Sequence, residues 1–169
     1  MPDWSPQASL QTMAELNVAA AVLSVSTPGT TFLPNPADAA ALATDVNDYG
    51  VELVASQPDR FGFFATVPMP HVDVAVAESV RALDQLDADG IVLLANSSGT
   101  YLGEDGQDDL WAALDARSAV VFIHRPTCRD PRCPVSFRSP RTSCSIRLVL
   151  LTCWYATGSG ASTRTSNSS

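Results

Sequence analysis

Residues 72–96, VDVAVAESVRALDQLDADGIVLLAN, decide the fold class. The pattern predicts a helix over Val72–Leu86. After a few polar residues comes Gly90–Leu94, GIVLL, a short uninterrupted apolar run. Runs of this kind are typical of strands that are buried on both faces of a parallel sheet. A helix that leads into a buried strand is the repeating unit of α/β proteins.

The same unit recurs on both sides of this stretch. Further strands are predicted at Ala19–Val25, Phe61–Val67 and Ala119–Ile123, and further helices after Ser5-Pro6 and at Pro36–Ser56 and Asp108–Ala116. The order α-β-α-β-α-β-α-β implies βα units with right-handed crossovers. A doubly wound sheet and a barrel both fit this order, and periodicity does not choose between them.

Composition limits the classes of protein that the chain can belong to. Its 169 residues can form one domain with a real core, but a full eight-stranded α/β barrel typically needs ~250 residues. The chain has no apolar run long enough to span a membrane and no secretory signal at its start, so we expect a cytoplasmic protein that binds no membrane. A net charge of −8 argues against a nucleic-acid partner.

The composition changes abruptly at His124. Residues 1–124 carry 17 acidic and three basic residues, a net charge of −14, whereas residues 125–169 carry one acidic residue and seven arginines, a net charge of +6. All four cysteines lie in the second part, at spacings that match no zinc motif. We therefore predict a domain over residues 1–124 and a tail of low order over residues 125–169. Within the tail, Ile146–Tyr155 could be a strand or a short helix.

Several ordered pieces of residues 4–124 resemble one known family. They are Trp4 before a helix, AVLSVSTPG at 21–29, Asn47 before a helix that ends in QPDRFGFFATVPMP at 57–70, the stretch at 72–96, YLGEDGQDDLWAALDAR at 101–117, and VVFIH at 120–124. In this order and spacing they are similar to the amidohydrolase-related (amidohydrolase 2) family. That family includes aminocarboxymuconate-semialdehyde, resorcylate and methylsalicylate decarboxylases.

The resemblance implies a (β/α)8 barrel with a divalent metal, usually zinc, at the carboxyl ends of its strands. The predicted strands would be about the second to the fifth of the barrel, and His124 would be the metal ligand that ends the fifth. The His-x-His pair of the first strand and the late aspartate of the family have no counterpart here. Since catalytic zinc sites use about three protein ligands, the chain as a monomer is expected to be incomplete and inactive.

The resemblance covers a partial barrel over residues 1–124 and leaves residues 125–169 as a tail outside the family, for which it suggests a hypothesis. The family usually has proline after the fifth-strand histidine, but Arg125 stands here. The Arg-, Ser-, Thr-, Cys- and Pro-rich tail resembles GC-rich DNA read in the wrong frame. A one-base shift with GC-rich codons turns His-Arg into His-Pro and residues 151–169 into a helix, a glycine break and the start of a strand. The alternative is a naturally divergent, disordered tail.

Other candidate residues have two interpretations. Ser26, Thr27 and Pro28 follow the first predicted strand, and Asn96 follows the third, so they could face a substrate pocket or be ordinary turn residues. His71 opens a helix and is expected to be an exposed loop residue. The large aromatic side chains are expected to pack in the core; they are Trp4, Phe61, Phe63, Phe64 and Trp111. The acidic cluster is expected to be solvated, before and at the start of a helix; it consists of Glu104, Asp105, Asp108 and Asp109.

By resemblance, the function would be non-oxidative decarboxylation of an aromatic or unsaturated carboxylic acid, with the metal as Lewis acid. Hydrolysis of a lactone or amide by the same kind of site is the alternative enzymatic function. A non-catalytic fragment is the third interpretation, because open sheet edges favour assembly or aggregation. The implied partners are a small carboxylic acid substrate and, as an option, further copies of the chain.

Overall fold

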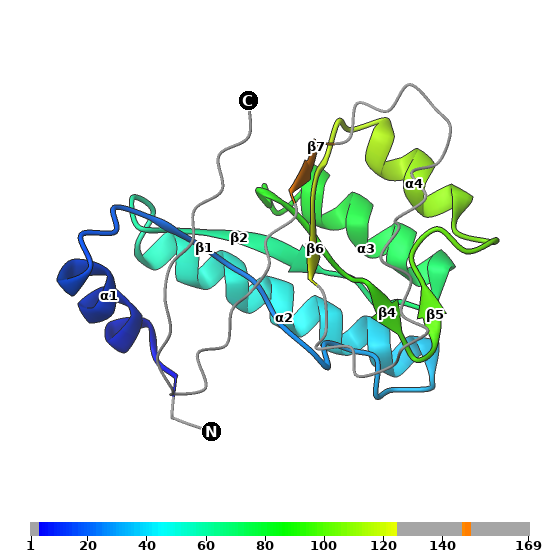
Figure 1. Cartoon of the computed structure of the whole chain (residues 1–169), viewed down its shortest axis with the longest axis horizontal. Coiled ribbons are helices and arrows are strands. Elements are labelled where there is room, and N and C mark those ends of the chain that lie inside the picture. Colours follow the sequence, from blue (N-terminus) through cyan, green and yellow to red (C-terminus); the bar gives the residue numbers. More distant parts are fainter. Residues whose placement is uncertain (1–3, 125–146, 150–169) are drawn as a thin grey trace, which may run out of the picture.

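The computed structural model describes residues 4–124 and 147–149. Its centre is a parallel sheet with the strand order β1-β2-β3-β6-β7 (Figure 1). The strands are β1 (Ala21–Leu23), β2 (Phe61–Thr66), β3 (Gly90–Leu94), β6 (Val120–His124) and β7 (Arg147–Val149). Two short strands, β4 (Asn96–Ser97) and β5 (Thr100–Tyr101), form a small antiparallel hairpin after β3.

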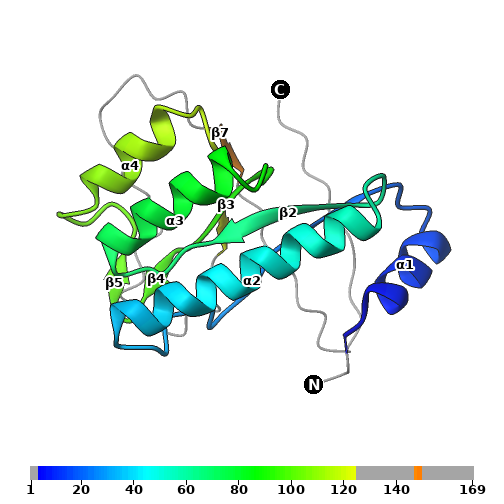
Figure 2. The same cartoon turned by 180° about the vertical axis from the view of Figure 1, so that it is seen from behind.

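The helices alternate with the strands. They are α1 (Pro6–Glu15), α2 (Pro36–Ser56), α3 (Val72–Asp84) and α4 (Asp108–Asp115). Figure 2 shows α2, α3 and α4 side by side over one face of the sheet, while α1 lies apart beside β1. The sheet and these three helices therefore form the two layers of an α/β fold.

The helix starts follow the capping residues of the sequence. The Ser5 side chain accepts a 3.1 Å hydrogen bond from the amide of Ala8, and Pro6 is the first helical residue of α1. In the same way, Asn35 accepts from the amide of Ala37 at 2.8 Å, directly before the proline that opens α2. The side chain before the proline accepts a hydrogen bond from one of the unpaired amides of the first turn. The proline itself loses no helix hydrogen bond, because the amide at this position would be unpaired in any case.

The core lies between the sheet and the covering helices. Alternate strand residues point towards the helices, among them Phe63, Ala65, Ile91, Leu93, Val121 and Ile123, all buried. From α3 and α4 they meet Ala75, Ala82, Leu110 and Leu114. Since successive strand residues point to opposite faces, the residues between them, such as Phe64, Phe122 and His124, face away from the helices.

One close approach holds β2 and β3 together at their amino ends. The Asp89 carboxylate accepts a 2.9 Å hydrogen bond from the Phe63 amide, and the Asp89 amide donates to the Phe63 carbonyl at 3.1 Å. A β-carbon at Gly62 would collide with that carboxylate, so a larger residue there would push Asp89 away from the Phe63 amide.

The structure confirms the predicted α/β order, and most element bounds agree within a few residues. Trp4 is a correction: it is 55% exposed, because it precedes α1 at the open side of β1 instead of packing in the core. The β4–β5 hairpin was not predicted, since two-residue strands carry no periodicity. β7 lies within Ile146–Tyr155, where strand and helix were both left open; the rest of the predicted tail lies outside the described residues. Within the described part, no helix is both long and apolar enough to cross a bilayer.

Candidate active-site edge of the sheet

His124 is the last residue of β6 and stands at the carboxyl edge of the sheet. It pairs in register with Leu94, the last residue of β3, and its carbonyl accepts a 3.0 Å hydrogen bond from the Ala95 amide. Its side chain is half-buried. In α/β folds this edge is where ligands bind, because the loops that follow the strands gather there.

Two phenylalanines lie beside His124 on the face away from the helices. The Phe122 ring is 6.3 Å from the imidazole of His124, centroid to centroid, and it stacks on Phe64 of β2 at 5.8 Å. Phe64 is half-buried and Phe122 is buried. Such an apolar wall next to one polar, titratable group suits a ligand that has an aromatic ring and a polar substituent.

The end of β2 is held by a side chain from α2. The Asn47 carboxamide donates to the Thr66 carbonyl at 2.9 Å and accepts from the Thr66 amide at 2.8 Å. The last β1–β2 pair is Leu23 with Phe63, so Thr66 lies beyond the reach of β1. Asn47 thus supplies the two hydrogen bonds that a neighbouring strand would otherwise make, which a buried backbone requires.

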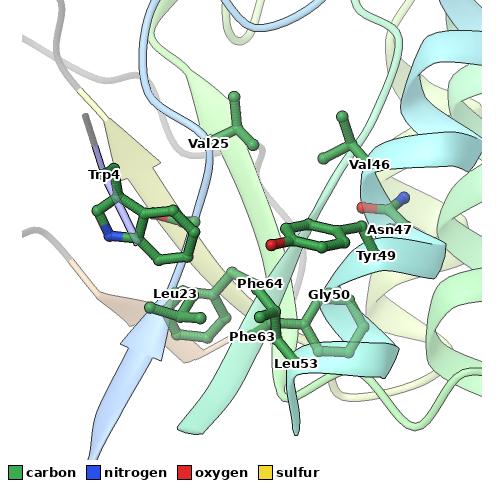
Figure 3. Close-up of a pocket in the computed structure, with 11 residues that line it drawn as sticks. Trp4, Leu23, Val25, Val46, Asn47, Tyr49, Gly50, Leu53, Phe63 and Phe64 are labelled. Carbon is green, nitrogen blue, oxygen red and sulfur yellow. The ribbon is translucent and has the colours of Figure 1, made fainter. Parts of the chain in front are cut away.

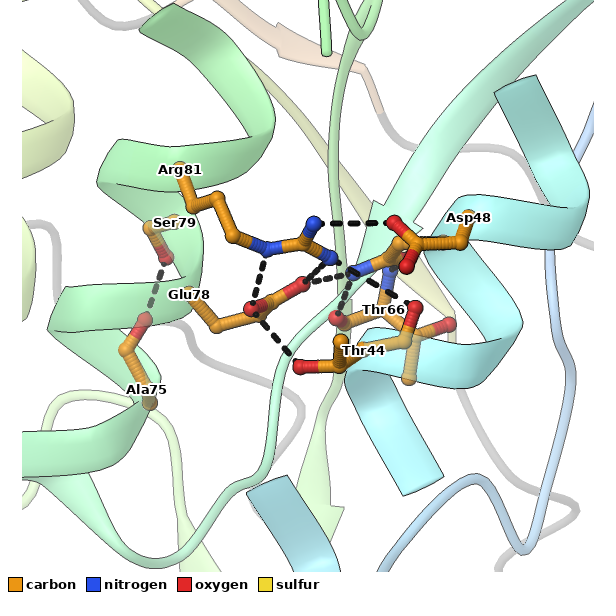
Figure 4. A network of polar contacts seen from close by, with 8 residues as sticks. Thr44, Asp48, Thr66, Ala75, Glu78, Ser79 and Arg81 are labelled. Carbon is orange, nitrogen blue, oxygen red and sulfur yellow. Dashed lines mark hydrogen bonds and ion pairs between the residues drawn. The ribbon is translucent and has the colours of Figure 1, made fainter. Parts of the chain in front are cut away.

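A buried acid continues this network into α3 (Figure 4). Asn47 also donates to Glu78 at 2.6 Å, and Glu78 is held by both sides of the Arg81 guanidinium at 2.9 and 2.8 Å. Asp48 is a second partner of Arg81 at 2.8 Å. The hydrogen bond to Glu78, followed by that to Asp48, raises the pKa of Arg81 above its ordinary value against the opposing effect of burial. The network therefore fixes α2, β2 and α3 relative to one another.

This network was missed from the sequence, although one signal was present. The buried residues of α2 are Ala39, Ala43, Asn47, Gly50 and Leu53, at helical spacing of three or four. Asn47 therefore stands on the apolar stripe of an alanine-rich helix, where a polar side chain needs a buried partner. Its partners Thr66 and Glu78 come from other segments, and no local pattern identifies them.

The other predicted candidates are turn residues in the structure. Ser26, Thr27 and Pro28 are exposed, and the carbonyls of Ser26 and Pro28 accept hydrogen bonds from Gly29 and Thr31 within the same loop. The Asn96 side chain accepts from the Gly99 amide at 3.1 Å in the β4–β5 turn. All of them lie at the carboxyl edge, but in the part of the chain that the structure describes no hydrogen bond joins them to the His124 side chain.

His71 differs from its expectation as an exposed loop residue. It is half-buried at the N-cap position of α3, and its Nε2 lies 3.3 Å from the Leu33 carbonyl. It therefore fastens the loop after β1 to the start of α3. The four acids Glu104, Asp105, Asp108 and Asp109 are exposed as predicted, the last two in the first turn of α4.

The described residues do not complete a metal centre around His124. Across residues 4–124 and 147–149, no group of three or more histidine, cysteine, aspartate or glutamate side chains could hold a metal ion. Catalytic zinc centres use about three protein ligands. His124 can thus contribute one imidazole ligand, and this part of the chain does not fit a metal by itself.

An apolar recess lies between β1 and α2 and shares Phe64 with the aromatic wall beside His124 (Figure 3). Its volume is about 300 Å³, and Trp4, Leu23, Val25, Tyr49 and Phe63 are among its lining side chains. His124 is not among them, and neither is any acid or base. The polar side chains of this lining are Ser24, Asn47 and Tyr49, so the recess offers hydroxyl and amide groups but no carboxylate or imidazole.

Comparison with known proteins identifies the family. The family model described as amidohydrolase (Amidohydro_2) matches residues 2–168. The chain belongs to this amidohydrolase family. Among curated relatives, decarboxylase macB of Penicillium terrestre is 39% identical over 168 residues, which cover 90% of this chain and 50% of that protein. The 6-methylsalicylic acid decarboxylase acuB of Aspergillus aculeatus is 38% identical over 127 residues, 73% of this chain and 38% of the relative.

Solved amidohydrolase structures share the fold. An amidohydrolase II superposes with a TM-score of 0.72 and 33% identity, covering 78% of this chain and 44% of the other. The 5-carboxyvanillate decarboxylase of Novosphingobium aromaticivorans, solved with bound manganese, gives 0.66 and 27%, covering 69% and 34%. The fold is thus part of a (β/α)8 barrel, which decides between the two architectures that the sequence pattern left open. The chain spans half or less of the length of these relatives.

Proposed function

We propose that this amidohydrolase chain carries part of a decarboxylase for aromatic carboxylic acids. The observation that carries the proposal is the place of His124, at the carboxyl end of a barrel strand and beside the stacked pair Phe64 and Phe122. Relatives with 38–39% identity are named decarboxylases, one of them for 6-methylsalicylic acid. These names favour decarboxylation over the hydrolysis of a lactone or amide.

In this proposal, His124 is one ligand of a divalent metal. Imidazole suits zinc as well as other divalent transition metals, and a structural relative holds manganese. The family resemblance favours zinc. Because the described residues supply no further ligand, the remaining ligands have to come from elsewhere. What this part of the chain offers is an imidazole and an adjoining aromatic wall.

Paramagnetic broadening tests the ligand role of His124. The chain has two histidines, so His71 is a built-in control. On titration with Mn²⁺, we expect the imidazole NMR signals of His124 to broaden at lower concentration than those of His71, and His124→Gln to remove the effect. Equal broadening of both rings, or earlier broadening of His71, would contradict the assignment.

A second candidate follows from the lack of further metal ligands among the described residues: the isolated chain is non-catalytic. One imidazole binds a divalent ion weakly, so the purified chain should hold well under one equivalent of zinc or manganese by elemental analysis and release no CO₂ from 6-methylsalicylate. One equivalent of tightly held metal would refute this. Light scattering shows in the same sample whether the chain forms a homo-oligomer.

We also propose that residues 125–169 are a separate segment produced by a one-base frameshift. The change of charge at His124 and the arginine that follows it support this. The family-model match up to residue 168 favours the alternative, a divergent tail that is read in frame. Sequencing the coding DNA through the region after codon 124 tests the hypothesis. A one-base error supports the frameshift, whereas confirmation of the reading frame overturns it.

A further inference from the structure

Two buried hydroxyl groups near the carboxyl edge are without a hydrogen-bond partner in the described structure. They are Thr66 Oγ1, at the end of β2, and Ser97 Oγ, in β4. Thr66 is 6% exposed and Ser97 is 2% exposed. Burying a hydroxyl without a partner is unfavourable, and most buried hydroxyls are therefore hydrogen-bonded to protein or to ordered water.

Both residues line one recess. It lies where the end of β2, the hairpin after β3 and the loop after β1 converge, and its wall also includes Thr30, Thr31 and Val92. The two residues that carry the unpartnered hydroxyls thus line the same small recess. They come from segments 31 positions apart in the sequence, so the fold, and not the local chain, brings them to the same recess.

The surrounding backbone is held firmly on both sides of the recess. Asn47 occupies the amide and the carbonyl of Thr66. On the other side, Ser98 Oγ donates to the Thr31 carbonyl at 2.7 Å and ties the hairpin to the loop after β1. These contacts fix the main chain on both sides of the recess, and in the described structure no protein atom hydrogen-bonds either hydroxyl. A partner that enters the recess can bond both.

The size of the recess decides what can enter it. The space open to the centre of a water-sized sphere is about 10 Å³, so the recess has room for a water molecule. An aromatic acid needs a far larger pocket. A water molecule both donates and accepts, as does each hydroxyl, so one water can satisfy both groups at once.

We propose that Thr66 Oγ1 and Ser97 Oγ together bind one buried water molecule, which bridges the end of β2 to the hairpin after β3. The water takes the place of a direct side-chain contact between these two segments. It thereby helps to fix the carboxyl edge on which His124 stands. This site is independent of the proposed decarboxylase function.

A crystal structure of the full chain, at a resolution that shows ordered water, tests the site directly. The expected result is one water within hydrogen-bond distance of both hydroxyl oxygens. Its absence, or a water that contacts only one of the two, overturns the proposal. A crystal structure of the Thr66→Val variant, grown in the same form, should lack this water.

Unfolding in urea gives a second, independent readout. If the water bridges the two groups, Thr66→Val and Ser97→Ala each raise the unfolding equilibrium constant about fivefold, and the double variant raises it no further than either alone. If the hydroxyls are truly unpartnered, both single variants lower that constant, and the proposal fails. Ser79→Ala is the matched control, because its buried hydroxyl already donates to the Ala75 carbonyl at 2.7 Å. Its effect should add to that of Thr66→Val.

Discussion

The Asn47 carboxamide pairs with the Thr66 peptide as a neighbouring strand would, with one hydrogen bond donated at 2.9 Å and one accepted at 2.8 Å. This contact joins the middle of α2 to the last residue of β2. Through Glu78 and Arg81 it extends to α3. The carboxyl edge of β2 is therefore positioned by polar contacts, although the core beneath the sheet is apolar.

Replacement of Asn47 by alanine should destabilise the chain strongly. It leaves the amide and carbonyl of Thr66 buried without partners and removes a hydrogen bond to Glu78, so we expect a loss of about 3 kcal/mol. Urea unfolding measures it. The control is Asn35→Ala, which removes the exposed N-cap of the same helix and should cost about 1 kcal/mol. Equal losses for the two variants would mean that the Asn47–Thr66 contact stabilises the chain no more than an exposed N-cap does.

The two acidic partners of Arg81 should contribute differently to the free energy of unfolding. The Glu78 side chain is 7% exposed, whereas that of Asp48 is 54% exposed. Glu78→Ala breaks a buried pair and should cost about 2–3 kcal/mol. Asp48→Ala breaks a solvated pair and should cost less than about 1 kcal/mol. The measurement is the free energy of unfolding of both variants, and a larger loss for Asp48→Ala would count against the network.

Gly50→Ala should lower stability, although the same change in an open helix raises it. A β-carbon at position 50 would lie 2.8 Å from the Phe63 ring, and Phe63 is only 4% exposed. Overpacking of this kind costs about 1–3 kcal/mol, which exceeds the ~1 kcal/mol that alanine gains over glycine in a helix. Thermal unfolding shows whether the midpoint temperature falls or rises. A raised midpoint would show that α2 and β2 are not in close contact between Gly50 and Phe63.

The exposed pair Asp84 and Arg117 predicts a local pH effect. The hydrogen bond from Arg117 lowers the pKa of the Asp84 carboxyl below its ordinary value. A lowered pKa in the folded state means that the pair stabilises the fold above the unfolded-state pKa, and that this contribution is lost as the pH falls through the folded-state pKa. Arg117→Gln should raise the pKa of Asp84 in an NMR titration. Arg60→Gln, which removes an arginine bonded to the carbonyls of Val18 and Ala19, should leave it unchanged.

Sequence periodicity was enough to predict the layers of the fold. Gly90–Leu94 and Pro36–Ser56 were predicted with the bounds that the structure has, because a buried strand and a long capped helix carry strong local signals. Periodicity did not separate a barrel from a doubly wound sheet, since both use the same βα unit. That choice required the family resemblance, and the comparison with solved structures confirmed it.

The candidate site was predicted only in part. His124 could be placed at a strand end because the apolar run VVFI stops there. The Asn47–Thr66–Glu78 network and the hydroxyl pair of Thr66 and Ser97 depend on contacts between distant segments, which no local pattern encodes. The role of His124 as a metal ligand stays a prediction.

A chimaeric enzyme tests the central claim most directly. In it, residues 4–124 replace the corresponding segment of the 39% identical decarboxylase macB, so that the rest of the barrel comes from the relative. The measurement is CO₂ release from the parent's substrate, together with metal content. We predict an active chimaera that loses activity at least about 100-fold, and its metal, on His124→Ala, but not on His71→Ala. A His124→Ala chimaera that keeps both metal and CO₂ release would contradict the account.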